Sequence, residues 1–124
     1  MSNTTLMMPI AQGEHATGEF VLMPVTLPEA WKDVLLERRA QVEVHGHTTE
    51  YDDCYSDGEL EDAAAAVAFA ACMSNGIYPT TWPWSWDYFK MHIQTKTYRQ
   101  CLVIVAALLL AAIERLDRKE QKEA

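Results

Sequence analysis

Apolar and polar positions follow a helical period in three stretches of the chain. In the first stretch, the side chains expected to face a core are Trp31, Val34, Leu35, Ala40 and Val42. Those expected to face the solvent are Lys32, Asp33, Glu37, Arg38 and Arg39. The second stretch is rich in alanine, whose small side chains let a neighbouring backbone come close, so this helix is expected to be central. The third is apolar on nearly all sides in its middle. This pattern predicts an all-α protein with three main helices, at about 28–45, 58–75 and 96–119.

Capping signals support two of these helix starts. Thr26 precedes Glu29 by three residues, and Ser56 precedes Glu59 by three, the spacing of a reciprocal capping box. Gly46 and the pair Asn75–Gly76 are natural helix ends.

The remaining segments lack a helical period. Residues 1–25 carry several Pro and Gly residues and predict an irregular arm with at most one edge strand, at 19–25. Residues 77–94 form a loop rich in Trp and Pro, and the charged residues 120–124 are expected to fray. The predicted organisation is therefore an arm at 1–25, one helical domain at 26–119 and a short tail.

Composition limits the class of protein. The chain has 124 residues, a formal net charge of −8 and 49% hydrophobic residues, which predicts one folded domain. The acidic balance argues against direct nucleic-acid binding and favours a partner with basic patches or a site for divalent metal. The longest apolar run, 101–113, is short for a membrane span, and no secretory signal is recognisable, so we expect a cytoplasmic protein without membrane contact.

The three cysteines show no metal-binding or redox spacing. Cys72 and Cys101 lie in apolar runs and are predicted to be small core residues, whereas Cys54 lies in a polar segment. The apolar surface of the third helix exceeds what two short helices cover, which predicts a homodimer or a higher oligomer.

Two pairs of acids could hold a metal ion. Glu59 and Asp62 lie three residues apart in the second helix, as do Glu114 and Asp117 in the third, so each pair projects to one side. If those faces met, they would form an oxygen-rich pocket suited to Mg²⁺, to which Glu37, Asp52 and Asp53 could add ligands or a general base. Helix capping and a solvated charged helix end explain the same acids equally well.

The ring-rich loop is a candidate contact surface for a protein or small-molecule partner. Trp82, Trp84 and Trp86 alternate, so in an extended segment they would point to one side. Tyr88 and Tyr51 could extend that surface, and the acidic connection 50–57 is a second candidate. The alternative is that the rings cover one end of the helical core.

Several motifs resemble those of a family of small phage and prophage proteins. These motifs are Glu37 to Gln41, Gly46, Tyr51-Asp52-Asp53, Gly58-Glu59-Leu60, Trp82 to Asp87, and Ala107-Leu108 with Ile113 to Arg118. In the family's pattern, Arg stands in place of Ala40 and His in place of Tyr51. The resemblance covers residues 36–118 and implies an accessory protein of a mobile element, without assigning an activity.

A second resemblance is to MazG-like all-helical nucleotide pyrophosphohydrolases, which hold Mg²⁺ with an E-x-x-E helix and an E-x-x-D helix. Gly58-Glu59-Leu60 is similar to the end of the first motif, and Glu114 to Asp117 has the form of the second. Ser56 and Tyr55 stand where that family carries further acids.

Two functional hypotheses follow. The first is a phage-type accessory protein in a bacterial host that binds a protein or small-molecule partner, without a cofactor, and counters host defence. The second is a Mg²⁺-dependent hydrolase that splits nucleoside triphosphates into monophosphate and pyrophosphate with Glu59, Asp62, Glu114 and Asp117.

Overall fold

The computed structural model describes residues 5–11, 20–43, 50, 53, 58–73 and 79–123. The chain divides into two compact units, of which the first ends at Lys32 and the second begins at Asp33. This boundary lies inside a helix, whereas the sequence placed it at the end of residues 1–25. Gly46, Tyr51, Asp52, Cys54, Ser56 and the pair Asn75–Gly76 lie outside the described residues.

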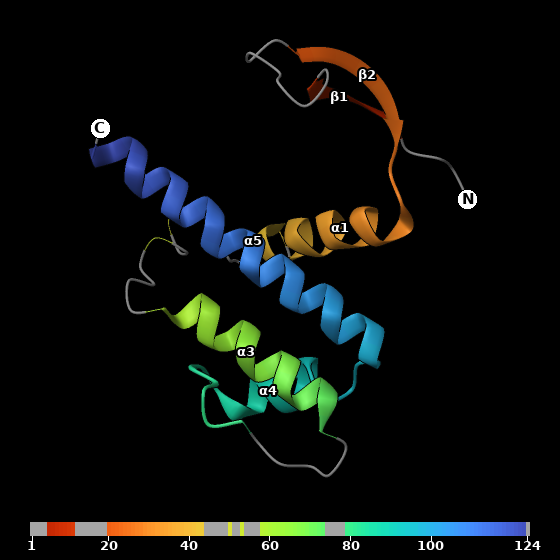
Figure 1. The fold of residues 1–124 in the computed structure, drawn as a ribbon. Coiled ribbons are helices and arrows are strands. Elements are labelled where there is room, and N and C mark those ends of the chain that lie inside the picture. The colour runs from red at the N-terminus through yellow and green to blue at the C-terminus, as the bar shows by residue number, and fades with distance from the viewer. Residues whose placement is uncertain are drawn as a thin grey trace. The chain divides into compact units, whose positions relative to one another are not determined.

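The first unit contains a two-stranded antiparallel hairpin of β1 (Thr5–Ala11) and β2 (Phe20–Thr26), shown in Figure 1. Thr5 lies opposite Thr26, and Ala11 lies opposite Phe20. β2 matches the one strand predicted from the sequence. β1 was not predicted, because its apolar run does not alternate and contains Pro9, a residue without a backbone donor.

The fold class is all-α, as predicted, and three long helices lie close to their predicted positions. They are α1 (Glu29–Glu43), α3 (Glu59–Cys72) and α5 (Tyr98–Glu123). A short helix that was not predicted, α4 (Trp86–His92), lies within the Trp- and Pro-rich segment. Its N-cap is Ser85, whose hydroxyl accepts a hydrogen bond from the backbone N–H of Asp87 at 3.2 Å.

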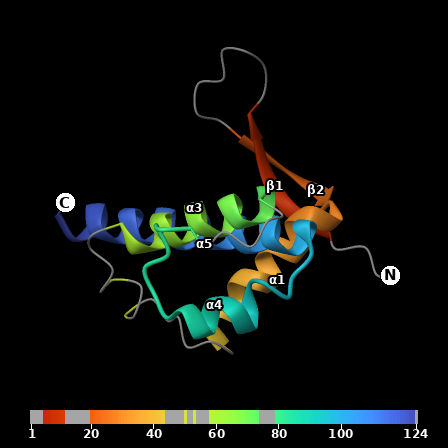
Figure 2. The same ribbon diagram turned by 90° about the horizontal axis from the view of Figure 1, so that it is seen from below.

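The central feature of the second unit is the antiparallel packing of α3 on α5 (Figures 1 and 2). The contact is made largely by alanines, because Ala63, Ala64 and Ala66 of α3 and Ala107 and Ala111 of α5 are all buried. Small side chains allow two helix axes to approach to about 8 Å, the short end of the usual range. The alanine-rich second helix is therefore central, as its composition indicated.

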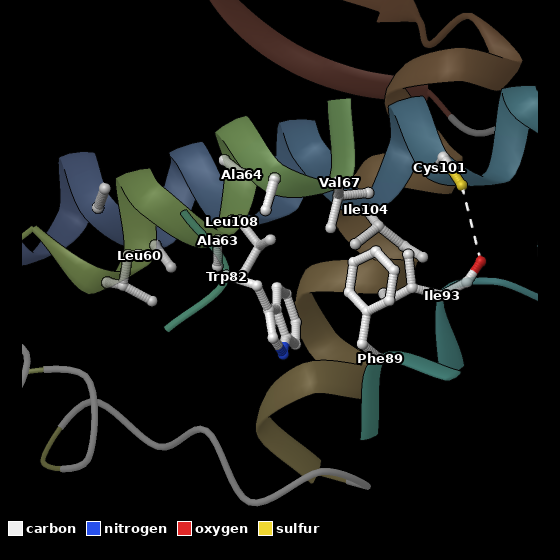
Figure 3. Packing of buried hydrophobic residues seen from close by; sticks show 13 residues of the cluster. Leu60, Ala63, Ala64, Val67, Trp82, Phe89, Ile93, Cys101, Ile104 and Leu108 are labelled. Carbon is white, nitrogen blue, oxygen red and sulfur yellow. Dashed lines mark hydrogen bonds between the residues drawn. The ribbon is translucent and has the colours of Figure 1, made fainter. Parts of the chain in front are cut away.

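Larger side chains from the segment that carries α4 complete this core (Figure 3). Phe89 is 1% exposed, and its ring centroid lies 5.0 Å from that of Trp82 in an edge-to-face arrangement. Ile93 packs in the same cluster, and its carbonyl accepts a weak hydrogen bond from the Sγ of Cys101 at 3.9 Å. The ring-rich segment thus covers part of the α3–α5 pair.

The starts of α3 and α5 are explained by residues that lie next to them in the sequence. α3 begins after Gly58, whose φ of 82° is favoured by glycine, and Ser56 of the predicted capping box lies outside the described residues. α5 carries a reciprocal capping box. The Thr97 N–H donates to the Gln100 side chain at 2.8 Å, and the Gln100 N–H donates to the Thr97 hydroxyl at 3.1 Å.

The polarity of α1 differs from the prediction at several positions, although Arg39 is exposed as expected. Arg38, expected to face water, is buried, and so is Gln41, while Trp31, Leu35 and Leu36 are exposed. The physical reason is a long-range ion pair, in which Arg38 Nη2 donates to Glu114 Oε2 of α5 at 3.2 Å. The pair holds the polar side of α1 against the rest of the second unit.

α5 continues through the tail that was expected to fray, since it is helical as far as Glu123. Within the described part of the chain, no helix combines the length and the apolar character needed to cross a bilayer. Cys101 is buried as predicted, and burial raises the pKa of its thiol. Cys72 is exposed, so the prediction that it lies in the core is wrong.

Candidate functional site

The predicted magnesium site depends on whether acids of α3 and α5 come together. The antiparallel packing does place the start of α3 and the later turns of α5 at the same end of the helix pair (Figures 1 and 2). However, Asp62 and Asp117 are exposed, and Glu59 is half-buried. Among the described side chains, no three acids, histidines or cysteines gather in a way that could hold a metal ion.

Glu114, the predicted ligand on α5, is engaged elsewhere. It accepts the hydrogen bond from Arg38, whose side chain is only 9% exposed. A buried guanidinium needs a compensating charge, because removing it from water costs several kcal/mol. This carboxylate therefore serves the docking of α1 on α5.

Asp53, the predicted extra ligand or base, is also paired. Arg118 donates from Nε and Nη2 to the same carboxylate oxygen at 3.0 and 2.8 Å, and Lys122 Nζ lies 3.7 Å from the other oxygen. The hydrogen bond from Arg118 is the main reason why the pKa of Asp53 lies below its usual range. The hydrolase hypothesis consequently stays a prediction of the sequence.

The Asp53–Arg118 pair makes a testable prediction about pH. Because the folded protein lowers the pKa of Asp53, the pair stabilises the fold above the unfolded-state pKa of about 3.9 and ceases to do so as the pH falls through the lower folded value. Asp53→Asn keeps an oxygen acceptor but loses the charge. We expect this variant to melt below the wild type at pH 7, and the difference to shrink as the pH falls below about 3.9 and to vanish below the lowered pKa. A melting difference that persists unchanged in acid contradicts this account.

The residues predicted to contact a partner differ in how exposed they are in the structure. Trp82 is buried, Trp84 and Tyr88 are half-buried, Trp86 is exposed, and Tyr51 is outside the described residues. The three tryptophans do not point to one side, because α4 begins at Trp86 and ends the extended segment. Trp82 belongs to the core, with its Nε1 donating to the Ser85 carbonyl at 2.9 Å.

A cleft of about 140 Å³ opens where this ring-rich segment meets α1 and α5. Its apolar lining is Trp82, Trp84, Ile93, Ile104 and Leu108, and its polar lining is Glu37, Gln41, Tyr88, His92 and Lys96. Pockets for drug-sized ligands are usually about 300–1,000 Å³, so this cleft suits a single ring or one side-chain group. A second hollow adjoins it and shares Glu37, Lys96 and Ile104.

Two side chains of α1 give the cleft its polar character. Glu37 and Gln41 are four residues apart and so lie on the same face of the helix. Gln41 is 6% exposed, and in the described part of the chain its amide has no hydrogen-bond partner. No cation within that part forms an ion pair with Glu37. The cleft therefore presents a carboxylate and an amide that no other described side chain engages.

The pKa of the Tyr88 phenol is changed by the position of this side chain in the cleft. Partial burial, and to a smaller extent the negative charge of Glu37, raise the pKa of Tyr88. Its ring stacks on Trp82 with centroids 6.4 Å apart, and it also contacts the His92 ring at 4.4 Å. The cleft thus combines aromatic surfaces with a negative charge at one wall.

The sequence identified Glu37 only as a further metal ligand or general base, with its side chain on the outer face of α1, and did not identify Gln41 as a site residue. Their spacing was visible, but which face of α1 turns inward depends on Arg38 and Glu114, 76 residues apart. No family model, curated protein or solved structure matches this chain, so the site stands on its own geometry.

Proposed function

We propose that this protein acts by binding, and that its cleft accepts the guanidinium group of an arginine on a basic protein partner. The observation that carries the proposal is the carboxylate of Glu37, which lies without an ion-pair partner among the described residues beside the rings of Tyr88, Trp82 and Trp84. A guanidinium is planar, carries five donors and is always charged. It can pair with a carboxylate while its plane stacks on an aromatic ring.

The remaining lining supports this choice. The Gln41 carbonyl oxygen can accept a further donor from the guanidinium, and the apolar floor suits the methylene stem of the arginine. Lys96 and His92 also line the cleft, but the Lys96 side chain is exposed and flexible enough to turn into the solvent. With a net charge of −8, the whole protein would attract a basic surface at long range.

This proposal fits the setting that the phage-family resemblance implies. An accessory protein that counters host defence would act by occupying a host protein surface, and a basic surface is the matching partner for this chain. Arginine is also among the residues that contribute most to the energy of protein interfaces.

The test uses three short, otherwise identical glycine-rich peptides that carry one arginine, one lysine or one citrulline. We expect the arginine peptide to bind most tightly, because lysine cannot form the planar contact and citrulline lacks the charge. Glu37→Gln should weaken arginine binding about ten- to a hundred-fold, the effect of losing a charged hydrogen bond. Titration calorimetry or the fluorescence of the cleft tryptophans measures each affinity.

The matched control is Glu43→Gln. Glu43 belongs to the same helix but is exposed and pairs with Arg39 at 2.9 Å, outside the cleft. If Glu43→Gln weakened arginine binding as much as Glu37→Gln, the effect would come from the overall negative charge of the protein and not from the cleft. The proposal is wrong if the arginine, lysine and citrulline peptides bind with equal affinity. It is also wrong if a nucleoside triphosphate binds in the cleft and the arginine peptide does not.

A further inference from the structure

A small hollow beside the later turns of α5 is lined mainly by basic side chains. It has a volume of about 130 Å³, and its lining consists of Asp53, Arg115, Lys119 and Lys122. We call it the basic hollow. None of these four residues lines the cleft described above, so the two sites are distinct.

The basic side chains of this part of α5 share one face of the helix. At about 100° per residue, Arg118, Lys119 and Lys122 lie within about 60° of Arg115 around the helix axis. The acids of the same turns lie about 80–160° away from Arg115, and they are Glu114, Asp117, Glu120 and Glu123. The two signs of charge are equal in number here, but they are separated around the helix.

The one acid in the lining of the basic hollow already has partners. One carboxylate oxygen of Asp53 accepts two hydrogen bonds from Arg118, at 2.8 and 3.0 Å, and the other lies 3.7 Å from Lys122 Nζ. Arg115 and Lys119 form no ion pair with any described residue. Three positive charges and one negative charge in the lining leave a formal charge of +2.

Arg115 also contributes a buried donor that lacks an acceptor. Its Nε is shielded from solvent, and no atom of the described chain accepts its hydrogen bond. Buried polar atoms are almost always hydrogen-bonded, because an unmet donor loses its water without compensation. The helix dipole favours cations such as Lys119 and Lys122 near the end of α5, but it does not explain this buried donor. The donor indicates an acceptor that binds in the basic hollow.

We propose that the basic hollow binds a phosphate group, either as the free ion or as the monoester of a small metabolite. A phosphate monoester carries a charge of about −1.5 to −2 at pH 7, which matches the +2 of the lining. Its oxygens can accept hydrogen bonds from a guanidinium and two ammonium groups at once. A carboxylate would balance only half of this charge.

The size of the basic hollow and the charge of the whole chain both favour a small anion. Pockets for drug-sized ligands are usually about 300–1,000 Å³, so 130 Å³ suits a single phosphate group. A nucleic acid would also meet the repulsion of a protein whose net charge is −8. A single phosphate interacts mainly with charges within about 10 Å, because salt screens the more distant ones.

The experiment is titration calorimetry of the full chain with inorganic phosphate and with glycerol 3-phosphate, at constant chloride concentration. We expect saturable binding of one phosphate group per chain, with a dissociation constant of about 1 mM or below. Arg115→Gln should weaken this binding about ten- to a hundred-fold, because it removes a charged donor. Lys119→Gln changes an exposed side chain, which should leave the fold intact, and should weaken binding about two- to five-fold.

The matched control is Arg99→Gln. Arg99 lies on the same helix, but it pairs with Asp33 at 2.8 Å and does not line the basic hollow, so its replacement should leave the affinity unchanged. Circular dichroism checks that every variant keeps its helix content.

The two ligands distinguish the source of the phosphate group. Tighter binding of the inorganic ion supports the inference and identifies free phosphate, and tighter binding of glycerol 3-phosphate supports it and identifies a phosphorylated metabolite. The inference is overturned if neither ligand binds saturably, or if acetate binds as tightly as phosphate. It is equally overturned if Arg99→Gln weakens phosphate binding as much as Arg115→Gln, or if Arg115→Gln and Lys119→Gln leave it unchanged.

Discussion

Replacement of Phe89 by alanine should destabilise the second unit by about 3–5 kcal/mol, the usual cost of deleting a fully buried aromatic ring. Phe89 is 1% exposed and lies edge-to-face with two rings, at 5.0 Å from Trp82 and 5.5 Å from Trp86. Each such ring pair adds about 0.5–1.5 kcal/mol beyond the burial of area. A loss of this size is a large part of the 5–15 kcal/mol that stabilises a typical domain.

Chemical denaturation of the purified variant measures this effect, with Phe69→Ala as the matched control. Phe69 is the same residue type on α3 but is 43% exposed, so its removal should cost only about 0.5 kcal/mol. If the two variants lose equal stability, the ring-rich segment does not complete the core. In that case the cleft, whose floor includes Trp82, would also lack a rigid wall.

The second large effect is expected at the contact between α3 and α5. Ala63→Leu should destabilise the protein by about 1–3 kcal/mol, because Ala63 is fully buried in the cluster that contains Leu108 and a larger side chain there would overpack it (Figure 3). The helices would have to separate or the added side chain would have to leave its preferred rotamer. Thermal or chemical melts measure the loss.

Ala65→Leu provides a close control for this prediction. Ala65 lies two residues further along the same helix but is exposed, and leucine is nearly as good a helix former as alanine. We expect a change within about 0.5 kcal/mol of zero. A harmless Ala63→Leu would mean that the alanines do not set the distance between α3 and α5.

Local sequence patterns predicted only part of the structure of the ring-rich segment. The density of Trp and Tyr left two interpretations open, a contact surface for a partner or a cover for the helical core, and Trp82 and Phe89 belong to the core. The short helix α4 was missed because its seven residues are too few for a periodic signal. Its start was nevertheless encoded by Ser85, a common capping residue.

The acids show the limit of arguments from spacing. Three-residue spacing placed each pair on one side of its helix, and α3 does pack on α5. Spacing could not indicate that Glu114 and Asp53 would be engaged by Arg38 and Arg118, since those partners are 76 and 65 residues away along the chain. The sequence therefore identified candidate ligands but not their competitors.

The sequence by itself determined where the three long helices lie and that α3 would pack closely, because helix propensity, capping and the distribution of alanine act over a few neighbouring residues. Only the tertiary structure decided which face of α1 turns inward. That choice depends on the pairing of Arg38 with Glu114, and it brings Glu37 and Gln41 to the cleft. An amphipathic pattern states which side chains differ in polarity, whereas the cost of leaving a buried charge unpaired is set by residues distant in the chain.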